Sequence, residues 1–270
     1  MTTLVLGGTG KTGRRVIDRL TALGRPVRNG SRSATPSFDW TDRGTWADVL
    51  RGVESVYVTY YPDLAVPGSV DDIETFTALA TKNGVRRIVL LSGRNEPQAE
   101  ASERVVQGSG LEWTVVRCAW FMQNFSEGYL RDAVLDGVIA LPAGDVAEPF
   151  VDADDIADVV VAALTQDGHA GRLYELSGPR LLTFADAAAD LTAALGRPVT
   201  YLPVTAAEFA AGAIEQGVPE DEVAMLNGLF AEVLDGRNAY VSDGVREALG
   251  RPARDFTPFA VEWGKTLPSA

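Results

Sequence analysis

Residues 3–13, Thr-Leu-Val-Leu-Gly-Gly-Thr-Gly-Lys-Thr-Gly, decide the fold that this chain is expected to adopt. A short apolar run leads into glycines at spacings of three, Gly7, Gly10 and Gly13. A helical pattern then starts near Lys11. In such a motif the first glycine permits a sharp turn out of a strand, the second lets a pyrophosphate approach the backbone, and the third lets the helix pack closely on the strand. Free N–H groups at the helix N-terminus would face the phosphates. The stretch therefore predicts a dinucleotide-binding turn.

The phosphate loop of nucleotide hydrolases is the alternative that the end of this motif imitates. Its leading glycine would have to stand at position 5, which is Val5. Since the position carries a β-branched side chain, we exclude that loop.

Length and composition set limits on the class of protein. The 270 residues suffice for one large α/β domain, or a core plus a smaller lobe. The net charge of −13 argues against a nucleic-acid surface or an anionic membrane. No membrane span or signal peptide is recognisable, so a cytoplasmic location is expected. Arginine-over-lysine and alanine-rich usage suggests a bacterial source.

The single cysteine and the single histidine offer little chemistry. Cys118 alone allows neither an internal disulfide nor a cysteine-based metal cluster. His169 stands in a Gly-His-Ala-Gly turn, where we expect a solvated loop residue.

Strand-like runs alternate with helical patterns over the first half, which is typical of a parallel sheet covered on both faces. Strands are expected at 3–6, 26–31, 36–40, 54–60, 86–92 and 112–117, with helices between them at 11–23, 45–50, 70–83 and 96–109. Later helices are expected at 154–164, 184–195, 206–216 and 220–234, with short strands near 173 and 199. The predicted fold is α/β, a Rossmann-type doubly wound parallel sheet in residues 1–150. A smaller, mostly helical lobe in 151–270 would be interleaved with it as one structural unit.

The end of the second predicted strand discriminates between the two nicotinamide cofactors. A carboxylate there binds the ribose 2′-hydroxyl of NAD, whereas an arginine pairs with the 2′-phosphate of NADP. Residues 29–33 read Asn-Gly-Ser-Arg-Ser and hold no acid. Arg32 offers a planar donor fork, Ser31 and Ser33 add hydroxyls, and Lys11 could add a second positive charge. NADP(H) is therefore the expected cofactor, with an ordinary exposed loop arginine as the alternative.

Further motifs extend over most of the chain: residues 6–13, Ser31-Arg32-Ser33, Phe38-Asp39-Trp40, Ser109 to Thr114, Arg117, Trp120 to Phe125 and Pro149 to Ala157. With these residues the chain resembles the NmrA-like branch of atypical short-chain dehydrogenases. The likeness is closest to the group of ergot-alkaloid reductases (festuclavine and agroclavine dehydrogenases) and their bacterial relatives.

This resemblance implies positions for cofactor and substrate. In the glycine motif the residues expected to bind the pyrophosphate are Gly7, Thr9, Gly10, Lys11, Thr12 and Gly13. Arg32 would hold the 2′-phosphate, beside Ser33. The adenine would lie beside Asp39 and Trp40, and the ribose and nicotinamide beside Thr59, Tyr60 and Ser92. The expected substrate pocket is Trp120, Phe121, Asn124 and Phe150, for whose aromatic rings core packing is the alternative.

A catalytic acid is harder to find. Ketone-reducing short-chain dehydrogenases use a tyrosine with a lysine four residues later, which lowers the tyrosine pKa so that it can protonate the alkoxide. Of the three lysines, Lys11, Lys82 and Lys265, none follows a tyrosine by four. A quinone, an iminium ion or an azo bond accepts hydride readily, and water can supply the proton. Tyr60 and Tyr61 are the candidate donors, with packing on the cofactor as the alternative.

Carboxylates elsewhere are expected to be structural. Glu103, on a predicted helix, is interpreted as a solvated or structural side chain. Asp152, Asp154 and Asp155 resemble a metal cluster only by composition, and Asp152 or Asp154 is expected to cap the following helix. No metal site is predicted.

The sequence thus favours an NADPH-dependent reductase of an electron-poor conjugated substrate. A non-catalytic NADP-binding redox sensor is the second hypothesis, and an isomerase or lyase with a structural cofactor is the third. We expect a small aromatic or conjugated substrate, no nucleic acid or membrane partner, and a monomer or homodimer.

Overall fold

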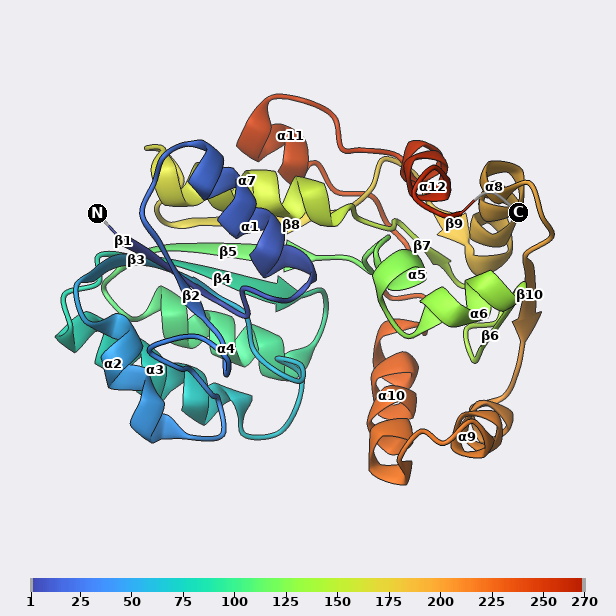
Figure 1. Ribbon diagram of the computed structural model, residues 1–270, viewed down its shortest axis with the longest axis horizontal. Helices are drawn as coiled ribbons and strands as arrows, with labels where there is room; N and C mark the ends of the chain where they lie inside the picture. The colour runs from blue at the N-terminus through green and yellow to red at the C-terminus, as the bar shows by residue number, and fades with distance from the viewer. Residues whose placement is uncertain (1, 269–270) are drawn as a thin grey trace. The chain divides into compact units, whose positions relative to one another are not determined.

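A computed structural model describes residues 2–268 (Figure 1). The chain divides into two compact units. Unit 1 comprises residues 2–118, 153–176 and 243–252, and unit 2 comprises 119–152, 177–242 and 253–268 of the described chain. Residues 153–176 and 243–252 belong to unit 1 because β8 (Arg172–Leu176) pairs with β5 (Glu112–Cys118) and these segments pack on its helices and strands.

Unit 1 is built on a six-stranded sheet. Its strands run in the order β2-β1-β3-β4-β5-β8, and every neighbouring pair is parallel. Strands covered on both faces are expected to be almost continuously apolar, and Val56, Tyr57 and Val58 in β3 are all buried. The strands are β1 (Thr2–Leu6), β2 (Val27–Gly30), β3 (Val53–Val58), β4 (Arg87–Gly93), β5 (Glu112–Cys118) and β8 (Arg172–Leu176).

Helices cover both faces of this sheet. In Figure 1, α1, α7 and α11 lie on one face, and α2, α3 and α4 lie on the other. Within these layers α1 packs on α7, and α3 packs on α4. Their bounds are α1 (Lys11–Ala22), α2 (Trp46–Leu50), α3 (Ser69–Lys82), α4 (Pro97–Gln107), α7 (Ala153–Thr165) and α11 (Gly244–Leu249). The predicted doubly wound α/β fold is confirmed.

The prediction of a strand at residues 36–40 is wrong. Asp39 forms only an isolated bridge with Asp42. Trp40 is buried instead in an aromatic cluster, with its ring centroid 5.3 Å from that of Trp46. The apolar residues of this segment pack in the hydrophobic core. The segment adds no strand to the sheet, in which β2 pairs with β1 and β1 with β3.

Unit 2 is mostly helical, with two two-stranded sheets. β6 (Val138–Leu141) and β10 (Thr200–Pro203) are parallel, whereas β7 (Ala147–Glu148) and β9 (Leu182–Thr183) are antiparallel. Its helices are α5 (Asn124–Glu127), α6 (Leu130–Asp136), α8 (Phe184–Leu195), α9 (Ala206–Glu215), α10 (Glu220–Val233) and α12 (Phe256–Gly264). The bounds of α8 are those predicted, because Thr183 and Asp186 form a capping box that marks its start.

Within residues 2–268, no helix combines the length and the apolar character that crossing a membrane requires.

Candidate functional site

The glycine turn after β1 has the geometry that the sequence predicts. Gly7 has φ +64°, its N–H donates to the Gly30 carbonyl (2.9 Å), and its own carbonyl accepts from the Gly10 N–H (2.8 Å). A Cβ on Gly13 would lie 2.7 Å from the Gly7 carbonyl carbon. The positive φ and this close approach both require glycine, so the turn and the start of α1 are held together at backbone contact.

The N-terminus of α1 is open to an anion. Gly10 is its N-cap, no side chain in the described part of the chain caps it, and its first turn holds no acidic residue. The first N–H groups of an α-helix lack intrahelical partners and carry the positive end of the dipole. Thr12 turns its side chain inward, where its hydroxyl accepts from the buried Tyr57 hydroxyl (3.0 Å). Thr12 can therefore serve an anion chiefly through its backbone N–H.

An acceptor at the end of β2 is unsatisfied beside this turn. The Asn29 Oδ1 atom is buried and has no hydrogen-bond partner among residues 2–268. A Cβ on Gly8 would lie 2.9 Å from Asn29 Cγ, so the amide lies directly against the turn. Burying an acceptor without a partner costs free energy, and a donor group of a bound ligand would remove that cost.

Arg32 lies just beyond β2, beside the expected ribose position. Both Arg32 and Ser33 are exposed, and the Ser31 and Ser33 hydroxyls are 3.4 Å apart. Within the described chain the Arg32 guanidinium has no hydrogen bond or ion pair, but its Cζ lies 5.6 Å from the ring centroid of Tyr61. The planar donor fork of Arg32 is thus exposed just beyond β2.

The two residues expected beside the adenine, Asp39 and Trp40, differ in how deeply they are buried. The Asp39 carboxylate accepts from the Thr41 N–H and hydroxyl (2.9 Å each), and these bonds, with the charge of Arg32, lower the pKa of Asp39. Trp40 is buried, and its indole N–H donates to the Thr59 carbonyl (3.0 Å). Trp40 therefore packs inside unit 1, whereas Asp39 remains at its surface.

The two tyrosines after β3 have different surroundings. The Tyr60 hydroxyl donates to Asp72 (2.7 Å), and burial together with that carboxylate raises the pKa of Tyr60. Its ring packs on Trp40, with 4.8 Å between centroids. Tyr61 is 68% exposed.

Ser92, at the end of β4, belongs to a buried polar network that the sequence does not reveal. Its hydroxyl donates to Glu103 Oε1 (2.6 Å) on α4. Arg117, on β5, donates to both oxygens of Glu103, and this pairing raises the pKa of Arg117 above its ordinary value although burial opposes it. Glu103 is only 2% exposed, so the prediction of a solvated or structural carboxylate is resolved in favour of a structural ion pair.

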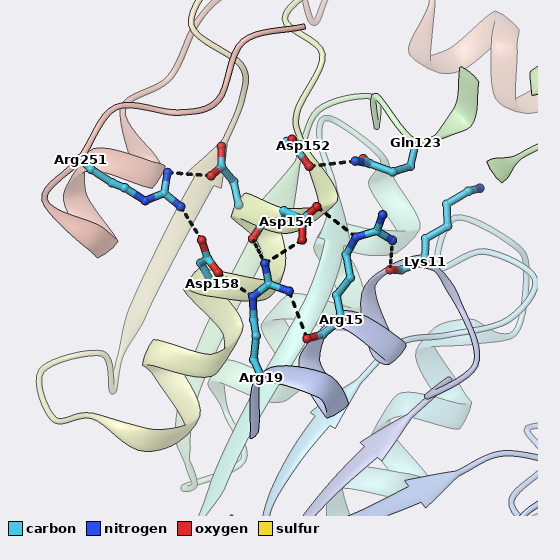
Figure 2. A network of polar contacts seen from close by, with 9 residues as sticks. Lys11, Arg15, Arg19, Gln123, Asp152, Asp154, Asp158 and Arg251 are labelled. Carbon is cyan, nitrogen blue, oxygen red and sulfur yellow. Dashed lines mark hydrogen bonds and ion pairs between the residues drawn. The ribbon is translucent and has the colours of Figure 1, made fainter. Parts of the chain in front are cut away.

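The acidic residues of α7 fix the start of α1 (Figure 2). Asp154 pairs with Arg15 (3.3 Å) and Arg19 (2.7 Å), while Arg15 also donates to the Lys11 carbonyl (2.8 Å). Burial opposes ionisation of Asp154, but these arginines outweigh it and lower its pKa. Figure 2 shows the Lys11 side chain pointing away from this network.

The other acidic residues near the start of α7 also have partners. Asp155 pairs with Arg251 (2.8 Å), which also contacts Asp158 (2.5 Å). Asp152, directly before α7, accepts from Gln123 (2.8 Å) within unit 2. Among residues 2–268 no group of histidine, cysteine, aspartate and glutamate side chains could hold a metal.

The predicted substrate residues all lie in unit 2, but they differ in burial. Phe150 is buried, with its ring centroid 5.3 Å from that of Phe125, so core packing describes it better than ligand contact. Trp120 is partly buried and lies 6.4 Å, centroid to centroid, from the exposed Tyr129. Tyr129 is an aromatic residue that sequence reasoning missed, because only the folded chain brings it to Trp120.

Phe121 and Asn124 lie on either side of a local turn. Phe121 forms a parallel bridge with Val151, and its carbonyl accepts from the Asn124 N–H (3.1 Å) at the start of α5. Both side chains are partly exposed, which leaves them available for ligand contact.

A glycine turn at the end of β1, a helix start without a side-chain cap from the described residues, and an exposed guanidinium after β2 together define a dinucleotide-binding α/β protein. The family model described as NAD(P)H-binding matches residues 7–167, and the chain belongs to this family.

Similar proteins match this chain over nearly its whole length. Agroclavine dehydrogenase from Claviceps fusiformis is 32% identical over 277 residues, which covers 96% of each chain. NAD(P)H azoreductase from Xenophilus azovorans is 32% identical over 278 residues, 95% of this chain and 96% of its own. The triphenylmethane reductase of Citrobacter sp., solved with NADP(H), has a TM-score of 0.80 at 20% identity. The match covers 98% of this chain and 100% of the reductase chain. The resemblance to the ergot-alkaloid reductase group is thereby confirmed, and the chain is an NAD(P)H-dependent oxidoreductase.

Proposed function

We propose that this oxidoreductase uses NADPH to reduce an electron-poor conjugated small molecule, namely a quinone, an imine or iminium ion, or an azo compound. The observation that carries the cofactor preference is Arg32, whose guanidinium makes no hydrogen bond or ion pair with any described residue. It lies just beyond β2, where the sequence has no carboxylate.

The glycine turn would hold the pyrophosphate. A side chain at Gly7 would collide with the Thr59 side chain, and one at Gly13 would collide with the backbone of Gly7 and Gly8. The start of α1 supplies N–H donors and positive dipole charge. The ion pairs of Arg15 and Arg19 with Asp154 support this first turn from α7. The nicotinamide, when bound, supplies a hydride.

The proton is proposed to come from water. The sequence holds no tyrosine followed by lysine four residues later, the Tyr60 hydroxyl is held by Asp72, and Ser92 is held by Glu103. A substrate that needs no acid to accept the hydride suits this set of residues. The name of one relative, NAD(P)H azoreductase, supports an acceptor with an N=N bond.

Unit 2 is proposed to bind the substrate through Trp120, Phe121 and Asn124, with Tyr129 beside them. Aromatic rings and a side-chain amide suit a planar conjugated molecule that carries a hydrogen-bond acceptor. Phe150 would support these residues from the core.

The test is NADPH oxidation by the purified chain with menadione, a cyclic iminium ion and methyl red in turn. Turnover of one or more acceptors, with NADPH preferred over NADH, is the expected result. Tight NADPH binding without turnover of any of them would favour the redox sensor instead. Absence of binding of either cofactor would contradict the proposal at its first step.

A further inference from the structure

Arg32 and Tyr61 meet across the strand that leads into the glycine turn. The sheet order β2-β1-β3 places β1 between the two strands that precede them. Arg32 lies two residues beyond β2, which ends at Gly30, and Tyr61 lies three residues beyond β3, which ends at Val58. The Cζ–centroid distance of 5.6 Å thus joins the carboxyl ends of two strands that are not neighbours.

The contact holds the guanidinium without occupying its donors. A cation over an aromatic ring is attracted by the ring face, and stacking leaves the in-plane N–H groups of arginine available. No described side chain takes those donors. Asp39 is close enough for the charge of Arg32 to lower its pKa, but its carboxylate is bonded to Thr41. The fork is held in place and remains free for a phosphate.

We propose that Tyr61 is a positioning residue for recognition of the 2′-phosphate: its ring holds the Arg32 guanidinium where the phosphate binds, and its hydroxyl takes no part in proton transfer. The inference rests on the NADPH preference proposed above. It extends that preference to a second residue and gives Tyr61 a role different from that of the proton donor expected from sequence.

The test compares two probes that differ only at the ribose 2′ position, adenosine 2′,5′-bisphosphate and 5′-AMP, by calorimetric titration at constant ionic strength. We expect the wild type to bind the bisphosphate about tenfold more tightly or better, since a charge-assisted bidentate pair is gained. Tyr61→Leu should weaken bisphosphate binding about three- to tenfold and leave AMP binding unchanged. Tyr61→Phe keeps the ring, so both affinities should stay within about twofold of wild type.

Tyr240→Leu is the matched control, because it removes another exposed tyrosine, in unit 2. Its affinities for both probes should equal those of the wild type. Equal weakening of both probes in Tyr61→Leu, or no weakening of either, would overturn the inference. Loss of turnover in Tyr61→Phe with unchanged cofactor affinity would also overturn it, because the hydroxyl would then be the acid.

Failure of the proposed function gives a different pattern. If the wild type binds the two probes equally well, the proposed NADPH preference is wrong, and the role proposed for Tyr61 is wrong with it. If the wild type and variants bind as expected but no acceptor is turned over, the reductase proposal fails while the role of Tyr61 stands.

Discussion

Glu103 accepts a 2.6 Å hydrogen bond from Ser92 while it forms a bidentate ion pair with Arg117, and the carboxylate that joins them is almost completely buried. One helix side chain thereby ties the ends of β4 and β5 together, beside the expected nicotinamide position. Removing one member of a buried ion pair leaves the other charge without compensation, which is why such pairs are costly to break.

Glu103→Gln should lower the free energy of unfolding by about 2–4 kcal/mol, less than a fully buried pair would lose because Arg117 also has Glu175 at 3.8 Å. Urea denaturation measures this change. Glu100→Gln on the same helix is the control, since its 4.0 Å contact with Arg104 is exposed and should contribute less than about 0.5 kcal/mol. Equal losses in the two variants would contradict the structural role of Glu103.

Gly13→Ala should abolish or strongly weaken NADPH binding and destabilise unit 1, because the new Cβ would lie 2.7 Å from the Gly7 carbonyl carbon and 2.9 Å from Gly8 Cα. NADPH fluorescence titration and thermal unfolding measure the two effects. Gly212→Ala inside α9, whose Cβ would meet nothing within 4 Å, should instead be neutral or stabilise by up to about 1 kcal/mol. Unchanged cofactor affinity in Gly13→Ala would refute the proposal that the close approach of Gly13 to Gly7 shapes the cofactor-binding turn.

Arg32→Asp should weaken NADPH binding by about a hundredfold or more and affect NADH binding far less, since it replaces a phosphate-binding charge with a repelling one. Competitive titration with the two cofactors gives the ratio. Arg28→Asp is unsuited as a control because Arg28 donates to two backbone carbonyls, whereas Arg25→Asp, at an exposed site outside this region, should leave the ratio unchanged. An equal loss of both cofactors in Arg32→Asp would show that Arg32 does not read the 2′-phosphate.

His169 should make stability depend on pH. It is 7% exposed, its Nδ1 lies 2.9 Å from the Tyr174 hydroxyl, and burial, followed by the charges of Arg87 and Arg172, lowers its pKa. The unfolded chain therefore binds a proton more readily than the folded one, so stability falls as the pH drops through about 6.5 toward the folded pKa. Unfolding free energies at pH 7.5 and 5.5 should differ more in wild type than in His169→Gln. Equal differences would contradict this assignment.

Local signals predicted the fold well, because they depend on residues close in sequence. The glycine spacing located the turn and α1, and the capping pair Thr183–Asp186 located α8. The errors arose where contacts with residues distant in sequence determine the local structure. Residues 36–40 look like a strand, but Trp40 packs on Trp46 and the segment pairs with no strand of the sheet.

The same distinction applies to the candidate site. Glu103 read alone is an ordinary helix carboxylate, since its partners Ser92 and Arg117 come from two other elements. His169, expected in a solvated turn, is buried by its contact with Tyr174. The contact of the Arg32 guanidinium with the Tyr61 ring depends on the strand order, which no local pattern in the sequence encodes.

The most direct test of NADPH-dependent reduction is isotope transfer from NADPH deuterated at both C4 positions to a cyclic iminium ion, followed by mass spectrometry of the amine. We expect one deuterium in each product molecule, at the former iminium carbon, in an amount equal to the NADPH consumed. Amine formed without deuterium while NADPH is consumed would contradict direct reduction by the bound cofactor.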